Sequence, residues 1–278
     1  MNKLSQARRT QIVAALVEGN SIRATGRMTG ASKNTIVKLL ADLGTACAAY
    51  HDSAMRNLAC RRIQVDEIWS FCYAKQKKAT DAMRKEHGWA GDVWTWTAID
   101  ADTKLVPSFL VGGRDTGYAT EFLQDLAGRL STRVQLTTDG HKVYLEAVED
   151  AFGSNIDYAM LIKVYGAEPA NDARYSPAKC LGANPVPISG NPDSDHISTS
   201  YVERQNLTMR MSMRRFTRLT NAFSKKIDNL RHAVALHFVL QLCQDSQDAQ
   251  GHSRDGSRNL GPRSDHVWSL EEIVDLMA

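Results

Sequence analysis

The stretch Ile63-Gln-Val-Asp-Glu-Ile-Trp69 decides which fold is expected, because it has the composition of a strand and a carboxylate in its middle. Isoleucine, valine and tryptophan favour strands. A lone carboxylate is costly to bury there unless something compensates its charge. Asp66 is therefore the first candidate ligand for a cation.

Two further acids lie in separate elements. Asp139 directly follows a strand-like run in Val134-Gln-Leu-Thr-Thr-Asp-Gly140, and Glu203 opens a basic helix in Ser200-Tyr-Val-Glu-Arg-Gln-Asn206. Carboxylates that meet from different elements need a cation between them, which predicts magnesium chemistry on a phosphodiester. One alternative stays open for Glu203: it follows Ser200 at the spacing of a helix capping box.

The helix that follows Glu203 is strongly basic. Arg210 comes seven residues after Glu203 and returns to the same helix face after about two turns. A cation on the same face as a metal-binding carboxylate would hold a phosphate against both. The arginines expected to contact DNA are Arg204, Arg210, Arg214 and Arg215.

The surrounding periodicity predicts an α/β fold in which helices cover a mixed five-stranded sheet. The expected strands span residues 63–73, 92–100, 105–111, 133–137 and 158–164, with helices over 118–130 and 143–152. Residues 75–85 are expected to form a basic loop, and the proline-rich residues 166–199 a long irregular connection. A long helical stretch is expected over residues 201–243, broken near Thr220, and then a polar linker over 244–265 and a short helix over 268–277.

The N-terminal segment predicts three short helices, over residues 5–17, over 22–28 and from Lys33 onward, with a glycine turn before the last. This is the layout of a helix-turn-helix, whose recognition helix enters the major groove of DNA with its first residues. The candidate DNA-binding residues are Lys33, Asn34, Thr35 and Lys38. An ordinary three-helix bundle is the alternative.

Charge is distributed unevenly along the 278 residues. The net charge is +3 overall, but residues 1–62 and 204–231 each carry +7 while residues 63–203 carry −7. Basic segments around an acidic centre suit a protein that binds metal centrally and a polyanion at its flanks. The five cysteines are widely spaced without a C-x-x-C, so we expect neither disulfides nor zinc, and a reducing cytoplasm. No membrane segment is expected.

Three blocks of the chain resemble bacterial insertion-sequence transposases of the InsA/InsB type, within the DDE transposase and integrase superfamily. They are Val65-Asp-Glu-Ile-Trp-Ser-Phe71, Thr137-Thr-Asp-Gly-His-Lys-Val-Tyr144 and the segment 200–221, which is the most specific. The resemblance covers roughly residues 5–240. It implies an RNase H-like fold and makes Asp66, Asp139 and Glu203 the catalytic, metal-binding triad.

The resemblance also implies cofactors and partners. These are two Mg²⁺ ions, for which Mn²⁺ would substitute, double-stranded DNA as element ends and target, and a homo-oligomer on DNA in a bacterial cytoplasm. The implied division of the chain is a helix-turn-helix module (1–44), a linker (45–62), a catalytic domain (63–243) and a polar linker with a short C-terminal helix (244–278).

One departure from the family is the separation of 64 residues between Asp139 and Glu203, which makes residues 166–199 an insertion beside the active site. Acids in or near that insertion are rivals for the third position, namely Glu168, Asp172, Asp193 and Asp195. Two other functions stay open. One is an inactive or domesticated DNA-binding regulator, and the other is a metal-dependent RNase H-like nuclease that cuts without joining.

Overall fold

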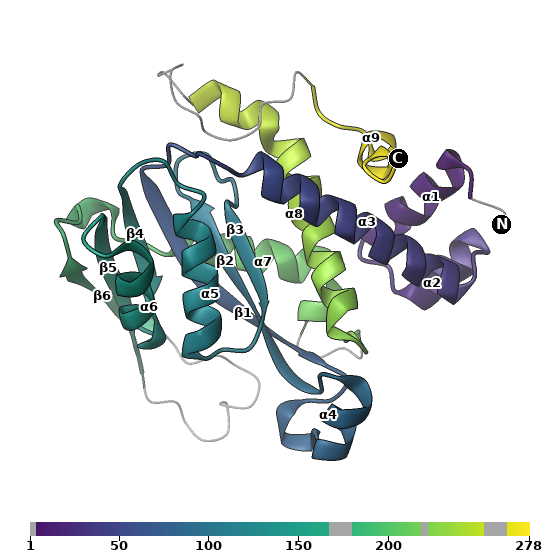
Figure 1. Cartoon of the computed structure of the whole chain (residues 1–278), viewed down its shortest axis with the longest axis horizontal. Coiled ribbons are helices and arrows are strands. Elements are labelled where there is room, and N and C mark those ends of the chain that lie inside the picture. The colour runs from purple at the N-terminus through teal and green to yellow at the C-terminus, as the bar shows by residue number, and fades with distance from the viewer. Residues whose placement is uncertain (1–3, 167–179, 218–221, 253–265) are drawn as a thin grey trace.

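The computed structural model describes residues 4–166, 180–217, 222–252 and 266–278. Its centre is a six-stranded mixed sheet with the strand order β3-β2-β1-β4-β5-β6 (Figure 1). Strands β1, β2 and β3 pair antiparallel, β4 runs parallel to both β1 and β5, and β6 is antiparallel to β5. The strands are β1 (Arg62–Cys72), β2 (Gly91–Asp100), β3 (Ser108–Gly112), β4 (Val134–Asp139), β5 (Ile156–Tyr165) and β6 (Cys180–Ser189).

Helices flank the sheet, and the mixed α/β arrangement is compatible with an RNase H-like fold. The α-helices are α1 (Gln6–Val17), α2 (Ile22–Thr29), α3 (Lys33–Ala54), α4 (Asp81–His87), α5 (Thr116–Ala127), α6 (Val143–Phe152), α7 (Ser200–Ser212), α8 (Ile227–His252) and α9 (Leu270–Asp275). Short 3-10 turns span η1 (Gln76–Lys78), η2 (Ser194–His196) and η3 (Arg214–Phe216).

The alternation of side chains along β1 explains which helices cover which face of the sheet. Ile63 and Val65 pack in one core with Phe122 of α5 and Tyr144 of α6. Ile68 points to the opposite face and packs with residues of α7 and α8. Figure 1 shows α5 and α6 in front of the strands and α7 behind them. The strand thus separates two buried cores.

The prediction of five strands was wrong, because part of the expected irregular connection forms the edge strand β6. Pro185 and Pro187 obscured this strand, since proline cannot donate a hydrogen bond to a neighbouring strand. An edge strand needs partners on one side only and tolerates proline. β6 pairs with β5 across Leu161–Pro185 and Ala159–Pro187 and has no strand beyond it in the described sheet.

Two helices extend beyond their expected ends, and one helix was not expected. α3 continues into the expected linker as far as Ala54, and α8 continues into the expected polar linker as far as His252. The expected basic loop over residues 75–85 instead contains η1 and α4. The Thr80 side chain caps α4 by accepting a hydrogen bond from the Met83 N–H, and Gly88 ends it with a positive φ. Thr80 is therefore a helix-start signal in the sequence. It was overlooked because the many basic residues of this segment favoured the prediction of a loop.

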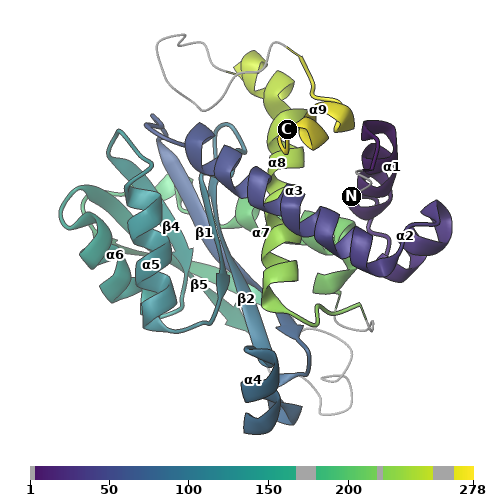
Figure 2. The same ribbon diagram turned by 45° about the vertical axis from the view of Figure 1, so that its right-hand side comes forward.

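The N-terminal helices share a core with the end of the chain. Ile12 of α1 and Leu43 of α3 are buried with Val239 of α8 and Ile273 of α9. The expected short C-terminal helix is α9, which begins with a capping box in which Ser269 and Glu272 exchange hydrogen bonds between side chain and backbone. Helices far apart in the sequence therefore form one packed unit beside the sheet, which Figure 2 shows from a second direction.

β1 and β2 extend beyond their neighbours and carry α4 at their far end (Figure 2). The pairing of β1 with β4 stops at Gln64, whereas its pairing with β2 continues to Cys72. We call residues 67–95 the β-arm. Along the β-arm, β1 keeps one strand neighbour until residues 222–224 join it through a bridge between Cys72 and Ser224.

Candidate metal centre

The two predicted aspartates lie where β1 and β4 diverge. The strands pair only over Arg62–Gln64 of β1, so Asp66 follows the last paired residue by two positions. Asp139 is the last residue of β4, and its Oδ1 accepts the backbone N–H of His141 at 2.9 Å. Diverging strands leave room for side chains between them. The sheet therefore brings together the carboxylates that the sequence placed in separate elements.

A third carboxylate, Glu67, joins the two aspartates. One ligand oxygen each from Asp66, Glu67 and Asp139 lies within 4.8 Å of the others, and this group could hold a metal ion. The sequence prediction missed Glu67 as a ligand. A signal was present, because Ile63 and Val65 mark its face of β1 as a core face, where a carboxylate is costly.

The electrostatics of the cluster are those of crowded carboxylates. Burial, the charge of Asp139 and that of Glu203 together raise the pKa of Asp66 to about 6. Burial and Asp139 likewise raise the pKa of Glu67 to about 7, although Arg114 opposes the shift. A carboxylate whose charge is disfavoured by its neighbours gains most from a cation that binds all of them.

Arg114, which follows β3, is the cation nearest to the cluster. Its Nη2 lies 3.2 Å from Oε2 of Glu67 and 3.9 Å from Oδ2 of Asp139. The guanidinium stacks 4.4 Å above the ring centroid of Trp94. Ion pairing on one side and stacking on the other fix its orientation. Arg114 therefore lies at the rim of the acid cluster with its charge directed towards it.

Several buried polar atoms around the cluster have no hydrogen-bond partner among the described residues. They are Oε1 of Glu67, Oδ1 of Asn206, the hydroxyl of Tyr144 and Nε of Arg114. The Tyr144 hydroxyl interacts with the Glu67 carboxylate and lowers its pKa, but the pair lacks the geometry of a full hydrogen bond. Buried polar groups are nearly always satisfied in folded proteins. Two of these atoms, Oε1 of Glu67 and Oδ1 of Asn206, are oxygens on side chains that are almost fully buried. Oxygen atoms of this kind are the ligands that a hard cation requires. The residues present therefore fit a metal site.

Helix α7 is fixed over Asp66 by two polar contacts. The Gln64 side-chain oxygen accepts the backbone N–H groups of Tyr201 and Val202, at 2.8 and 3.2 Å, and so satisfies the first turn of the helix. One turn further along, Nδ2 of Asn206 donates to Oδ2 of Asp66 at 2.9 Å. Gln64 and Asp66 share one face of β1, so this face positions α7 against the cluster.

Glu203 lies near the cluster but outside it. Its Oε1 is 2.6 Å from the ammonium of Lys163 on β5 and also accepts the hydroxyl of Thr199. Thr199 is the N-cap residue of α7, but its side chain accepts no hydrogen bond from the first turn, and Ser200 forms no capping box with Glu203. Glu203 is near enough to raise the pKa of Asp66, but the structure does not place it among the three clustered carboxylates.

Of the four rival acids, the two that the structure describes, Asp193 and Asp195, lie away from the cluster. Glu168 and Asp172 lie outside the described residues. The backbone N–H and carbonyl of Asp193 both form hydrogen bonds with the side chain of Gln135. The Asp193 side chain accepts the N–H of Asp195, so the two acids lie together. Gln135 precedes Asp139 by four strand residues, or about 13 Å. These two acids therefore occupy the opposite end of β4.

The candidate DNA-binding residues of α3 gather at its exposed start. Lys33 and Asn34 are exposed, Thr35 is partly exposed beside the Ser32 cap, and Lys38 is exposed and paired with Asp42. Figure 1 places this end of α3 beside α2, on the side of the molecule away from α6. The expected positions are thus accessible but remote from the carboxylates.

The four arginines after Glu203 differ in their surroundings. Arg204 and Arg214 are exposed and Arg210 is partly buried. Arg215 is used within the protein, where its Nη1 donates to Ser224 Oγ and to the Asn229 carbonyl at 2.7 and 2.8 Å. Because this guanidinium holds the start of α8 against β1, we do not include Arg215 in the proposed DNA surface.

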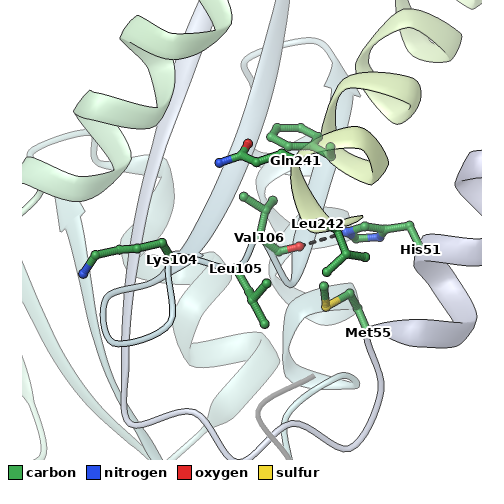
Figure 3. Close-up of a pocket in the computed structure, with 8 residues that line it drawn as sticks. His51, Met55, Lys104, Leu105, Val106, Gln241 and Leu242 are labelled. Atoms are coloured by element: carbon green, nitrogen blue, oxygen red, sulfur yellow. Dashed lines mark hydrogen bonds between the residues drawn. The ribbon is translucent and has the colours of Figure 1, made fainter. Parts of the chain in front are cut away.

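A small pocket lies between α3 and α8, and its residues hold these elements together rather than forming a second functional site (Figure 3). His51 of α3 donates from Nε2 to the Val106 carbonyl at 2.8 Å, with Leu242 of α8 beside it. Burial lowers the pKa of His51 to about 4, so the ring is neutral at physiological pH. The contact links α3 to the segment between β2 and β3.

Comparisons with models of protein families and with curated proteins found no match. Within the described ranges, no helix combines the length and apolar character needed to cross a membrane. The functional argument therefore depends on the residues and geometry of the metal centre itself.

Proposed function

We propose that this protein is a DNA transposase of the DDE type that cuts and joins DNA strands with the help of Mg²⁺. The observation that carries the proposal is the cluster of Asp66, Glu67 and Asp139, whose ligand oxygens lie within 4.8 Å of one another beside the unpartnered buried Oδ1 of Asn206. The motif resemblance of the three sequence blocks supports the same reading. Oxygen ligands without nitrogen or sulfur favour Mg²⁺, with Mn²⁺ as a substitute.

In this proposal each residue has a defined part. Asp66 and Asp139 would hold the metal, which would supply charge stabilisation at the attacked phosphate and a water of lowered pKa. Glu203 would be a further ligand once it is released from its ion pair with Lys163. Asn206 orients the Asp66 carboxylate through its hydrogen bond. Arg204 and Arg210 of α7 and Arg214 of η3 contact the DNA backbone.

The proposed binding module consists of α1, α2 and α3 as a helix-turn-helix that recognises the terminal inverted repeats. Gly30 ends α2 in the left-handed conformation, with φ of 68°, as a tight turn between two helices requires. Lys33, Asn34, Thr35 and Lys38 then face the major groove. The molecule would act as a homo-oligomer when two element ends are held together on DNA.

A nuclease that cuts without joining would use the same carboxylates. The pairing of Glu203 with Lys163, outside the cluster, is the observation that favours a second candidate, a catalytically silent DNA-binding regulator. Both alternatives bind DNA. They differ from a transposase in whether a new phosphodiester bond forms.

A strand-transfer assay on labelled element ends with Mg²⁺ or Mn²⁺ separates the three functions. We expect joined products with the intact protein and none with Asp66→Ala, Asp139→Ala or Glu203→Ala. Cleavage without joining would identify a nuclease, and binding without cleavage a regulator. Lys33→Ala and Asn34→Ala serve as matched variants, since they should weaken end binding while leaving metal-dependent nicking of nonspecific DNA intact.

A further inference from the structure

The face of the β-arm that begins at Glu67 carries a row of aromatic rings. Trp69 and Phe71 follow Glu67 at alternate positions and therefore share its face of β1. Their ring centroids lie 5.8 Å apart, and Phe223 stacks on Phe71 at 4.9 Å. Trp94 lies opposite Trp69 in the neighbouring strand. The row thus leads directly away from the acid cluster.

Cations lie over these rings. Arg114 covers Trp94 while it contacts Glu67, so it joins the row to the cluster. The ammonium of Lys75 lies 5.9 and 5.8 Å from the ring centroids of Trp69 and Phe71. Ring faces combined with cations are the elements from which proteins build sites for single strands of nucleic acid. The exposed Lys77 and Lys78 follow at the end of the row.

The rings are not needed as a buried core for the β-arm. Trp69, Phe71 and Trp94 are only partly buried, whereas Trp96 of the central core is 0% exposed. The opposite face of β1 already holds the β-arm, because Ile68 and Cys72 are buried there with residues of η3 and α8. Aromatic surface beside a phosphodiester-cleaving site therefore remains available to a ligand.

We propose that this aromatic row binds unpaired nucleotides of the DNA strand next to the phosphate held at the metal centre. The inference rests on the proposed function. In a duplex the base faces are stacked on one another, so only an unpaired base offers a face to Trp69 or Phe71. Lys75, Lys77 and Lys78 would accompany the backbone of the same strand. The ligand class is single-stranded DNA, such as frayed nucleotides at an element end.

The test measures binding of the full-length protein, without divalent metal, to a duplex that carries a single-stranded overhang containing 2-aminopurine. Stacking on an aromatic ring quenches 2-aminopurine emission. We expect Trp69→Leu to abolish the quenching and to weaken overhang binding roughly 5- to 150-fold. A blunt duplex should bind both proteins equally. Trp268→Leu, which removes a tryptophan next to α9, is the matched control and should bind as the intact protein does.

If Trp69→Leu lowers the melting temperature, it no longer separates loss of stacking from loss of folding. Two further variants then test the proposal. Trp69→Phe keeps a ring and should retain the quenching. Lys75→Gln should reduce the slope of log affinity against log salt by about 0.7, as expected for the loss of one backbone contact on a single strand. Unchanged quenching and affinity in Trp69→Leu, or an unchanged salt slope in Lys75→Gln, would overturn the proposal.

The outcome is separable from that of the proposed function. Quenching of the overhang probe by a protein that never cleaves or joins element ends would overturn the transposase proposal and leave a site for single-stranded DNA. Joining activity that is lost with Asp66→Ala would support the transposase proposal. Unaltered probe binding by Trp69→Leu in the same experiments would overturn the proposed site for single-stranded DNA.

Discussion

The acids carried by the sheet and the acid carried by a helix behave differently in this structure. Asp66, Glu67 and Asp139 belong to strands, and their carboxylates meet. Glu203 belongs to α7 and is paired with Lys163 instead. Hydrogen-bonded strands fix the spacing of their residues, whereas a helix lies where side-chain contacts hold it. The comparison teaches that strand pairing alone brings carboxylates together, whereas the acid of α7 is held apart by its ion pair with Lys163.

The largest predicted effect on joining comes from replacing either Glu203 or Glu67 by glutamine. We expect Glu203→Gln to lower single-turnover joining by about 10³-fold or more, because a metal ligand is lost from the reactive state. Glu67→Gln, which weakens the anchor of Arg114, should cost roughly 10- to 100-fold. A larger loss with Glu67→Gln than with Glu203→Gln would show that the sheet alone supplies the ligands.

The contact between the sheet and α7 gives the second test. Asn206→Ala removes the hydrogen bond that orients Asp66, and we expect the dissociation constant for Mn²⁺ to rise roughly 10- to 100-fold. Calorimetric titration measures this directly. Gln205→Ala is the matched control, because Gln205 is buried in the same helix but exchanges hydrogen bonds with Gln241. Equal effects on Mn²⁺ binding would mean that only the position of α7 matters.

The hydrogen bonds from Gln64 to the first turn of α7 predict a smaller effect, which is a loss of folding stability. Gln64→Ala leaves two backbone N–H groups of α7 without an acceptor, so the free energy of unfolding should fall by about 2 kcal/mol. Denaturant titration measures the change. Gln135→Ala, which removes an exposed contact to Asp193, should cost less than about 1 kcal/mol. A Gln64→Ala protein as stable as the intact one would show that α7 is held by its apolar face alone.

The smallest predicted effect is the pH dependence of the metal-free protein. The raised pKa values of Asp66, about 6, and Glu67, about 7, mean that the folded state keeps protons that the unfolded chain releases near pH 4. Stability should therefore fall as the pH rises from 4 through 7. Melting temperatures in chelator at pH 5 and pH 8 test this. The decrease should be smaller in Asp66→Asn, and an identical decrease would assign it to other groups.

Most of the sheet was predictable from the sequence because its strands are largely apolar runs. α6 was predicted with its observed bounds, and β1 and β4 within two residues. β6 was missed because prolines argue against a central strand, and nothing local shows that a strand lies at an edge. α4 was missed because its cap was hidden in a basic segment.

The candidate site was predicted only in its strand positions. Asp66 and Asp139 were identified because each interrupts an apolar run. Glu67 carried the same signal one residue later. Arg114 and Lys163 approach the carboxylates only after the chain has folded, and no sequence spacing connects Lys163 to Glu203, forty residues away. Local patterns therefore identified the ligands, while tertiary packing determined their neighbours.

The shared core of α1, α3, α8 and α9 has a consequence for protein synthesis. A ribosome makes the N-terminal helices first, yet Ile12 and Leu43 find part of their packing partners only in α8 and α9. These helices cannot complete their core until residues 270–275 have left the ribosome. A nascent chain therefore reaches its finished N-terminal surface only after the carboxylates of the sheet have been translated.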